Sequence, residues 1–313
     1  MRQPQETNSI NELDTVIRKF FSFYDDGCAP PEWILTNDIW KKYMNQTIIY
    51  FDSSDNSSTT LENVKALSKK REPVNIEMQQ CYDHRNLGAL WGYQVGNYGS
   101  FDHSINISIF TQTPFKYYAH DRYSLVNLLN VVAPAFDSPQ QPDQKYFDEG
   151  NNSNALIQRF TLIFKMIINC AKSKNLPVVC LTGFGLGAFN NKSEHYIQGF
   201  LNAISENNIT GIEFLMMDYT ENLTKEINDL FGYEFITWHF TNYNELGRAV
   251  GGVLKKFGSN NVLFTNPWDP WSVLGNGNSN DNSWDGNWGR RTAISVLGLP
   301  QLNHEISYVD LAC

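Results

Sequence analysis

Long apolar segments, charged residues and several catalytic motifs are scarce or missing in this sequence of 313 residues. No stretch approaches the roughly 20 consecutive apolar residues that a membrane-spanning helix needs, and the opening residues, MRQPQETNSINELD, are polar where a secretory signal would be apolar. The formal net charge of −9 argues against a broad nucleic-acid-binding face. We therefore expect a protein without membrane or nucleic-acid partners that works in the cytoplasm, or in a host cytosol if it is a delivered bacterial effector.

Metal-binding and nucleophilic signatures are also missing. The five cysteines contain no CxxC pair and are expected to be free thiols. The six histidines show no HExxH spacing, so neither a metal site nor a cofactor is expected. No serine or cysteine stands in a GxSxG sequence, which argues against an α/β-hydrolase, and no Gly-Lys-Ser/Thr step marks a Walker loop.

From residue 121 onward, the chain alternates between strand-like and helical segments. Residues 138–154 are expected to form a loop and 292–297 a further helix. Strands that alternate with helices and lack polar alternation indicate a mostly parallel sheet covered on both faces, a three-layer α/β/α fold. Apolar runs predict strands at 125–132, 178–181, 211–218, 233–239 and 261–265, and helical periodicity predicts helices at 156–171, 195–204, 223–230 and 244–257.

The first 120 residues are less regular. Short helices are predicted near 16–23 and 60–69, and strands at 47–51 and 105–111. We interpret residues 1–120 as an N-terminal extension of α and β elements that packs on a core formed by residues 121–313. The pattern of this part does not indicate a function.

A glycine-rich turn, TGFGLGAF at Thr182–Phe189, joins the strand at 178–181 to the helix at 195–204. Glycines at 183, 185 and 187 let the backbone approach a ligand without a Cβ clash, and the start of the next helix offers unpaired N–H donors. The turn therefore predicts a phosphate or diphosphate site. A tight turn without a ligand is the alternative.

A second segment, from Asn266 to Arg291, holds three aspartates and four tryptophans among many glycines and asparagines. Linkers seldom carry so much indole, so an ordered binding loop is expected. Asp281 and Asp285 would share one face if this part is helical, and paired carboxylates suit glycosidic hydrolysis. A calcium loop, or simple turn and N-cap roles, are the competing interpretations.

The stretch 125–204 resembles the second half of a macrodomain, the ADP-ribose-binding α/β fold. The turn TGFGLGAF is particularly similar to the phosphate loop of poly(ADP-ribose) glycohydrolases. This resemblance implies that the turn holds the diphosphate and distal ribose of ADP-ribose. The residues implied as ligand contacts are Gly183, Phe184, Gly185, Leu186, Gly187, Ala188 and Phe189.

The later run NPWDPWS…GNGN…DNS.DG..GR resembles that of bacterial effector-type arginine ADP-ribosyl hydrolases. In familiar macrodomains the corresponding loop comes earlier in the chain, so a circularly permuted macrodomain is expected. The resemblance implies that Asp281, Asp285 and Asp269 replace the catalytic acids of the glycohydrolases, whose Gln-Glu-Glu signature is absent here. The further ligand contacts expected are Asn266, Gly275, Asn276, Gly277, Asn278 and, at the end of another strand, Asp218.

These resemblances imply an ADP-ribosyl hydrolase in which water attacks the distal ribose at C1. Arginine-linked mono-ADP-ribose is the preferred substrate, and the expected partner is ADP-ribose or an ADP-ribosylated protein such as ubiquitin or another arginine-modified protein. Two other functions stay open: a reader module that binds ADP-ribose without cleaving it, and a calcium- or carbohydrate-binding protein.

Overall fold

The structure of the chain is a computed structural model. Within the residues that it describes, no helix is long and apolar enough to cross a membrane. The described residues are 14–19, 37–54, 61–62, 64–65, 107–117, 122–137, 142–217, 225, 229, 243–267, 288, 292 and 303–312.

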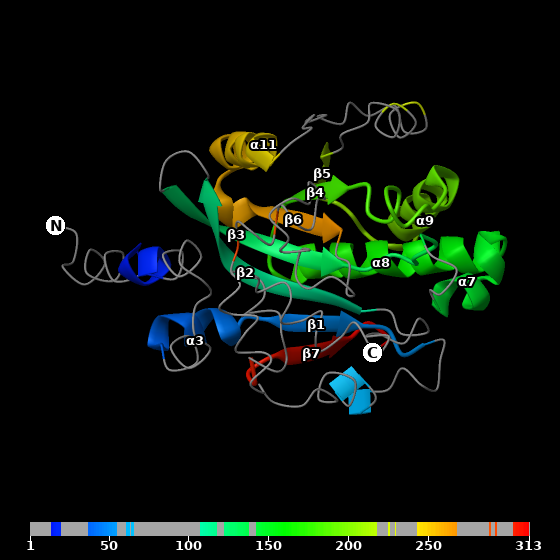
Figure 1. Cartoon of the computed structure of the whole chain (residues 1–313), viewed down its shortest axis with the longest axis horizontal. Helices are drawn as coiled ribbons and strands as arrows, with labels where there is room; N and C mark the ends of the chain where they lie inside the picture. The colour runs from blue at the N-terminus through cyan, green and yellow to red at the C-terminus, as the bar shows by residue number, and fades with distance from the viewer. Residues whose placement is uncertain are drawn as a thin grey trace.

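A mixed seven-stranded sheet forms the centre of the described structure, in the order β5-β4-β6-β3-β2-β1-β7 (Figure 1). Strands β5, β4, β6 and β3 run parallel to one another, β2 is antiparallel to both of its neighbours, and β7 is parallel to β1. The strands are β1 Ile48–Phe51, β2 Ile107–Tyr117, β3 Arg122–Val131, β4 Val178–Thr182, β5 Glu213–Met217, β6 Val262–Pro267 and β7 Ser307–Asp310.

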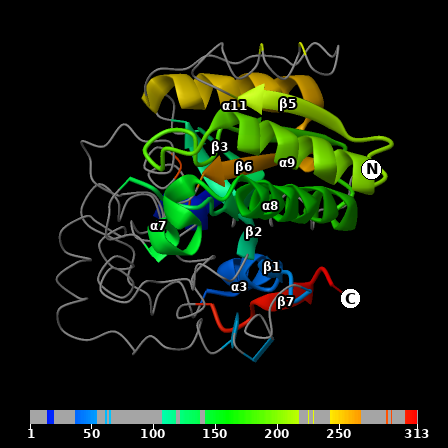
Figure 2. The ribbon, with the colours of Figure 1, turned by 90° about the vertical axis from the view of Figure 1, so that its right-hand side faces the viewer.

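Helices cover both faces of this sheet, as an α/β fold requires. Helices α8 and α9 lie side by side on one face, and α11 and α3 lie on the other (Figures 1 and 2). The arrangement is compatible with three layers. The helices are α3 Asp38–Met44, α7 Pro142–Tyr146, α8 Ser153–Ser173, α9 Ser193–Glu206 and α11 Tyr243–Phe257, with short 3₁₀ turns η1 Asp148–Gly150 and η2 Ser259–Asn261.

The sheet unites residues from both sides of the expected boundary at residue 120. Strand β2 ends at Tyr117 and its antiparallel neighbour β3 begins at Arg122. Strand β1 pairs with β2 in turn. The first 120 residues therefore contribute two strands to the same sheet as the later ones.

Helix α8 begins and ends where its sequence dictates. The Asn152 side chain caps it by accepting a hydrogen bond from the Ala155 N–H (3.2 Å). After Ser173 the chain takes a left-handed conformation at Asn175 (φ 54°), and Pro177 then cannot continue a helix. This stop directs the chain into β4.

Close contact between α8 and α9 depends on Gly199. A Cβ at this position would lie 2.4 Å from the Cβ of Phe160 on α8 and 2.9 Å from the backbone N of Thr161. Only glycine allows this approach. The contact fixes α9, the helix that follows the glycine turn, against α8.

Candidate functional site

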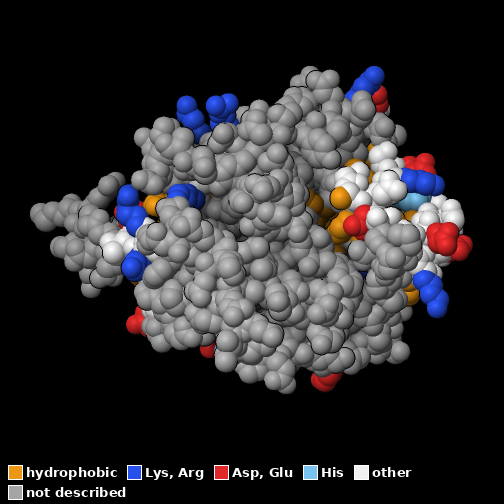
Figure 3. Space-filling model, in the orientation of Figure 1, with side chains coloured by type: hydrophobic (Ala, Val, Ile, Leu, Met, Phe, Trp, Pro, Cys, Tyr) orange, Lys and Arg blue, Asp and Glu red, His pale blue; other side chains and the backbone are white. Residues whose placement is uncertain are grey.

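The neighbouring strands β4 and β6 run parallel, so their carboxyl ends lie side by side at one edge of the sheet. After β4 the chain passes through the glycine turn into α9, on the α8 face. After β6 the next described residue, Trp288, lies in the core cluster of the α11 face. In open α/β sheets, ligands bind at the carboxyl ends of the strands. Figure 3 shows apolar side chains at the surface on this side of the molecule, bordered by polar and charged ones.

The glycine turn is held in shape by its own hydrogen bonds. Gly185 adopts a left-handed φ of 80°, and a Cβ there would lie 2.5 Å from the Cβ of Ala133, so no other residue fits without a shift. The turn therefore needs glycine at this position for both backbone conformation and space. Its N–H to O bonds run from Phe184 to Thr182 (2.8 Å), Leu186 to Gly183 (3.1 Å), Asn190 to Gly187 (3.0 Å) and Asn191 to Gly185 (3.0 Å).

The loop that leaves β3 is tied to this turn. The Asn191 Nδ2 donates to the Pro134 carbonyl at 2.7 Å, and the Phe136 N–H donates to the Phe189 carbonyl at 3.0 Å. The exits of β3 and β4 therefore form one rigid unit on either side of the end of β6. Sequence reasoning did not identify residues 132–137 as part of the site, because the contact joins segments that are distant in sequence.

Backbone donors are available in the turn. Among the described residues, the N–H groups of Gly187, Ala188 and Phe189 form no hydrogen bond. The following helix α9 begins at Ser193, and the side chain of its N-cap residue Lys192 makes no capping bond. Free N–H groups before and at a helix start attract anions, as the sequence predicted for a phosphate.

Phe184 contributes to the turn in a different way. Its side chain is fully buried, with ring centroids 4.9 Å from Tyr196 and 5.2 Å from Phe164. Of the seven turn residues predicted to contact a ligand, Phe184 can offer only its backbone. Its ring anchors the turn to α8 and α9.

Hydroxyl groups join the ends of β4 and β6. The Thr182 and Thr265 Oγ1 atoms lie 3.2 Å apart, and Thr265 Oγ1 donates to the Cys180 carbonyl at 3.0 Å. From α9, the Tyr196 hydroxyl donates to the Thr182 carbonyl at 2.7 Å. These bonds fix the ends of β4 and β6 to each other and to α9.

Two buried asparagines stand at the ends of β6 and β3. Asn266 and Asn130 face each other in the ladder, both are fully buried, and Asn266 Nδ2 donates to Asn130 Oδ1 at 2.8 Å. The remaining amide atoms, Asn266 Oδ1 and Asn130 Nδ2, have no hydrogen-bond partner in the described part of the chain. The sequence pointed to Asn266 but not to Asn130, which sits inside an apolar run.

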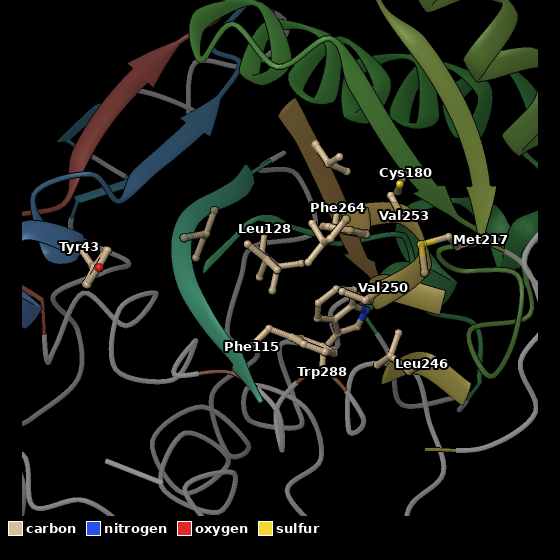
Figure 4. Close-up of a cluster of buried hydrophobic side chains, with 14 of the residues drawn as sticks. Tyr43, Phe115, Leu128, Cys180, Met217, Leu246, Val250, Val253, Phe264 and Trp288 are labelled. Carbon is tan, nitrogen blue, oxygen red and sulfur yellow. The ribbon is translucent and has the colours of Figure 1, made fainter. Parts of the chain in front are cut away.

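Trp288 brings the far end of the aspartate-rich segment back to the sheet. Its fully buried indole packs edge-on against Phe115 of β2 (centroids 5.3 Å apart) and at a tilt against Phe264 of β6 (5.6 Å) (Figure 4). Thr292 donates through Oγ1 to the Trp288 carbonyl at 2.9 Å and forms a β-bridge with Phe115. The chain thus leaves β6 at Pro267 and is again in contact with β6 at Trp288.

His195, in the first turn of α9, makes stability depend on pH. It is 2% exposed, its Nε2 lies 3.1 Å from the Ser153 Oγ, and burial lowers its pKa from 6.5, an effect that Glu194 opposes and Lys192 reinforces. The folded state therefore holds His195 neutral, while the unfolded chain takes up the proton more readily. We expect the free energy of unfolding to be highest above about pH 6.5 and to fall as the pH drops below it.

Urea denaturation at pH 7.5 and pH 5 measures this difference. His195→Gln should reduce the loss between the two pH values, whereas His304→Gln, which changes an exposed histidine, should leave it unchanged. An equal pH dependence in wild type and His195→Gln would contradict the assignment to this side chain.

The other residues that the sequence pointed to lie outside the described residues. They are Asp269, Asp281 and Asp285, expected as catalytic groups, and Gly275, Asn276, Gly277, Asn278 and Asp218, expected as ligand contacts. Of the expected contacts, the structure brings the glycine turn and Asn266 to the ends of adjacent strands. A scan against models of known protein families finds no match to the chain, and neither does a search of curated proteins, so a functional proposal rests on the site itself.

Proposed function

We propose that the protein is an ADP-ribosyl hydrolase that removes ADP-ribose from modified protein side chains, with arginine-linked ADP-ribose as its preferred substrate. One observation carries the proposal: the carboxyl ends of the adjacent strands β4 and β6 bring together free N–H donors in the turn after β4 and a buried, partly unpaired amide at Asn266. The first kind of group binds a diphosphate and the second binds a sugar hydroxyl. These are neighbouring parts of ADP-ribose.

The order of the two elements along the chain supports a circularly permuted macrodomain. The glycine turn comes first in the sequence and Asn266 follows 77 residues after Phe189, yet their strands are neighbours and parallel. In the macrodomains that the sequence resembles, the asparagine-containing strand end comes first. A permutation would exchange the chain order and keep the two loops together, and the adjacent ends of β4 and β6 support this interpretation.

The aspartates supply the chemistry in this proposal. They belong to the segment that connects Pro267 to Trp288, and Asp285 comes three residues before Trp288 in the sequence. One carboxylate accepts a proton from the attacking water while the water oxygen bonds to C1 of the distal ribose. The C1–N bond to the arginine breaks, and the leaving guanidine nitrogen keeps the electron pair and takes up the proton. A second carboxylate stabilises the positive charge that develops on the ribose.

Release of ADP-ribose from an arginine-modified protein tests this chemistry. We expect turnover by the wild type and a loss of about 10²- to 10⁴-fold for Asp285→Ala or Asp281→Ala, the range for removal of a general acid or base, and we include Asp269→Ala in the same series. Asp38→Ala, on the exposed surface of α3, is the control and should keep wild-type activity. Equal release by all variants would remove the aspartates from the mechanism.

Calorimetric titration with free ADP-ribose tests the binding half separately. Gly185→Ala should weaken binding at least tenfold, because the added Cβ collides with Ala133 and displaces the turn. Gly211→Ala is the matched control: its φ of 84° is equally left-handed, but nothing lies within 4 Å of the added Cβ. Tight binding without turnover on arginine-, glutamate- or serine-linked substrates would replace the hydrolase by a reader module.

A further inference from the structure

Strand β3 carries two buried asparagines, and only one of them is explained by the fold. Asn127 is satisfied: its Nδ2 donates to the carbonyls of Ser259 and Val262 (3.1 Å each) and its Oδ1 accepts from Gln112 (3.3 Å). Asn130 is more deeply buried, and its amide bonds only to Asn266 within the described chain. A buried donor without a partner is destabilising, so a ligand that satisfies Asn130 would explain why it is tolerated there.

The pair formed by Asn130 and Asn266 always presents one donor and one acceptor. One amide donates to the other, so an N–H group on one side chain and a carbonyl oxygen on the other are left over. Exchanging O and N in both amides gives the same result with the roles reversed. The conclusion therefore does not depend on how the two amides are oriented.

This combination excludes ligand groups that only accept or only donate hydrogen bonds. An anion such as phosphate only accepts hydrogen bonds, and an ammonium group only donates them. A hydroxyl group does both, and two neighbouring hydroxyls of a sugar can meet the donor and the acceptor together. The pair is thus complementary to a neutral sugar and not to the diphosphate.

The pair also lies on a defined face of the sheet. Leu128 and Phe264 belong to the core cluster of the α11 face, so Asn130 and Asn266, each two residues further along its strand, project to that same face. The glycine turn anchors its Phe184 ring on the opposite, α8 face. A ligand that reaches both elements must cross the end of β6.

We propose that Asn130 is a positioning residue that fixes the amide of Asn266, and that the two side chains together form hydrogen bonds with adjacent hydroxyls of the ligand's sugar. Under the proposed function, on which this inference rests, that sugar is the distal ribose. ADP-ribose then binds with its diphosphate toward α9 and its distal ribose toward α11 and Trp288. ADP lacks the distal ribose, so the two asparagines should not contribute to its binding affinity.

Titration of ADP-ribose and ADP against the full chain tests this assignment. Wild type should bind ADP-ribose more tightly than ADP. Asn130→Ala should lower ADP-ribose affinity about tenfold and leave ADP affinity within about twofold, so that the preference is lost. Asn130→Ala combined with Asn266→Ala should lose little more than Asn266→Ala alone, because the two amides act as a unit.

Asn127→Ala is the matched control, since it removes a buried and fully bonded asparagine from the same strand. It should reduce thermal stability and keep the wild-type ratio of ADP-ribose to ADP affinity. If Asn130 has only a structural role, Asn130→Ala should likewise leave this ratio unchanged. If Asn130→Ala does not fold, Asn130→Ser carries the same comparison with a smaller loss of polarity.

The outcomes separate the two proposals. If Asn130→Ala keeps the wild-type ratio, or if wild type binds both nucleotides equally, the sugar-reading role is wrong while ADP-ribose binding stands. If wild type binds neither nucleotide, the proposed function fails, and the role of the pair in reading the distal ribose fails with it.

Discussion

Phe184→Ala is expected to lower the free energy of unfolding by about 3–5 kcal/mol, the range for removing a fully buried phenylalanine. The Phe184 ring fills the space between α8, α9 and the sheet, where it packs against Phe160, Phe164 and Tyr196. No other described aromatic side chain in the glycine turn is fully buried. Urea denaturation of the purified chain, followed by far-UV circular dichroism, measures the change.

Phe189→Ala provides the comparison within the same turn. The Phe189 side chain is half-buried at the edge of the α8-face cluster, so its removal should cost clearly less. Phe184 lies between Gly183 and Gly185 in the sequence, so the glycine turn should become mobile when its ring is removed. The N–H groups of the turn would then lose their fixed positions, and ADP-ribose binding should weaken. Equal destabilisation by the two variants would show that the turn is not anchored through Phe184.

Trp288→Ala is expected to have a similar effect on stability, about 3–5 kcal/mol, from the opposite side of the sheet. The indole closes the space between β2, β6 and α11, where it contacts Phe115 and Phe264. Trp288→Phe keeps much of this packing and should lose less. Differential scanning calorimetry of both variants measures the difference.

The same pair of variants tests whether Trp288 supports the proposed activity. Since Trp288 fixes the chain shortly after Asp285, Trp288→Ala should reduce ADP-ribose release even at a temperature where the variant is fully folded. Trp288→Phe should retain most of it. Wild-type turnover by a folded Trp288→Ala variant would contradict a link between this anchor and the catalytic segment.

Periodic apolar patterns made the core of the fold predictable. Residues 156–171 repeat apolar side chains at helical spacing, and α8 extends over Ser153–Ser173. The run at 178–181 lies within β4, and the run at 261–265 overlaps β6, which begins at Val262. These predictions are confirmed because burial on the sheet imposes the pattern locally. The mixed direction of the sheet depends instead on long-range pairing, which no single segment reveals.

Elements without a local pattern were missed. The sequence gives no signal for β7, whose four residues SYVD have a partly exposed, alternating burial pattern. Residues 138–154 were expected to be a loop but contain α7 and the turn η1. The helix expected from residue 292 is wrong at its first residue, since Thr292 bridges to Phe115 of β2. In each case a distant partner, and not local propensity, determines the conformation.

In the candidate site, too, features with a local sequence pattern could be predicted and those that depend on distant contacts could not. The glycine turn could be predicted because glycine spacing after an apolar strand is a local property, and Gly185 does need its left-handed conformation. Asn130 could not, because it lies within the run LVNLLNVV and becomes unusual only through Asn266, 136 residues later. The buried ring of Phe184 likewise depends on helices that precede and follow it.

The position of β1 between β2 and β7 has a consequence for synthesis of the chain. Ser53, just after β1, is hydrogen-bonded to Asp310 of β7, 257 residues later. Ribosomes add about 5–20 residues per second, so on the order of tens of seconds pass between the two. Throughout that interval one edge of β1, rich in Ile, Tyr and Phe, stays open to strands from other nascent chains. We therefore expect that docking of β7, which covers this edge of β1, limits aggregation of the newly made protein.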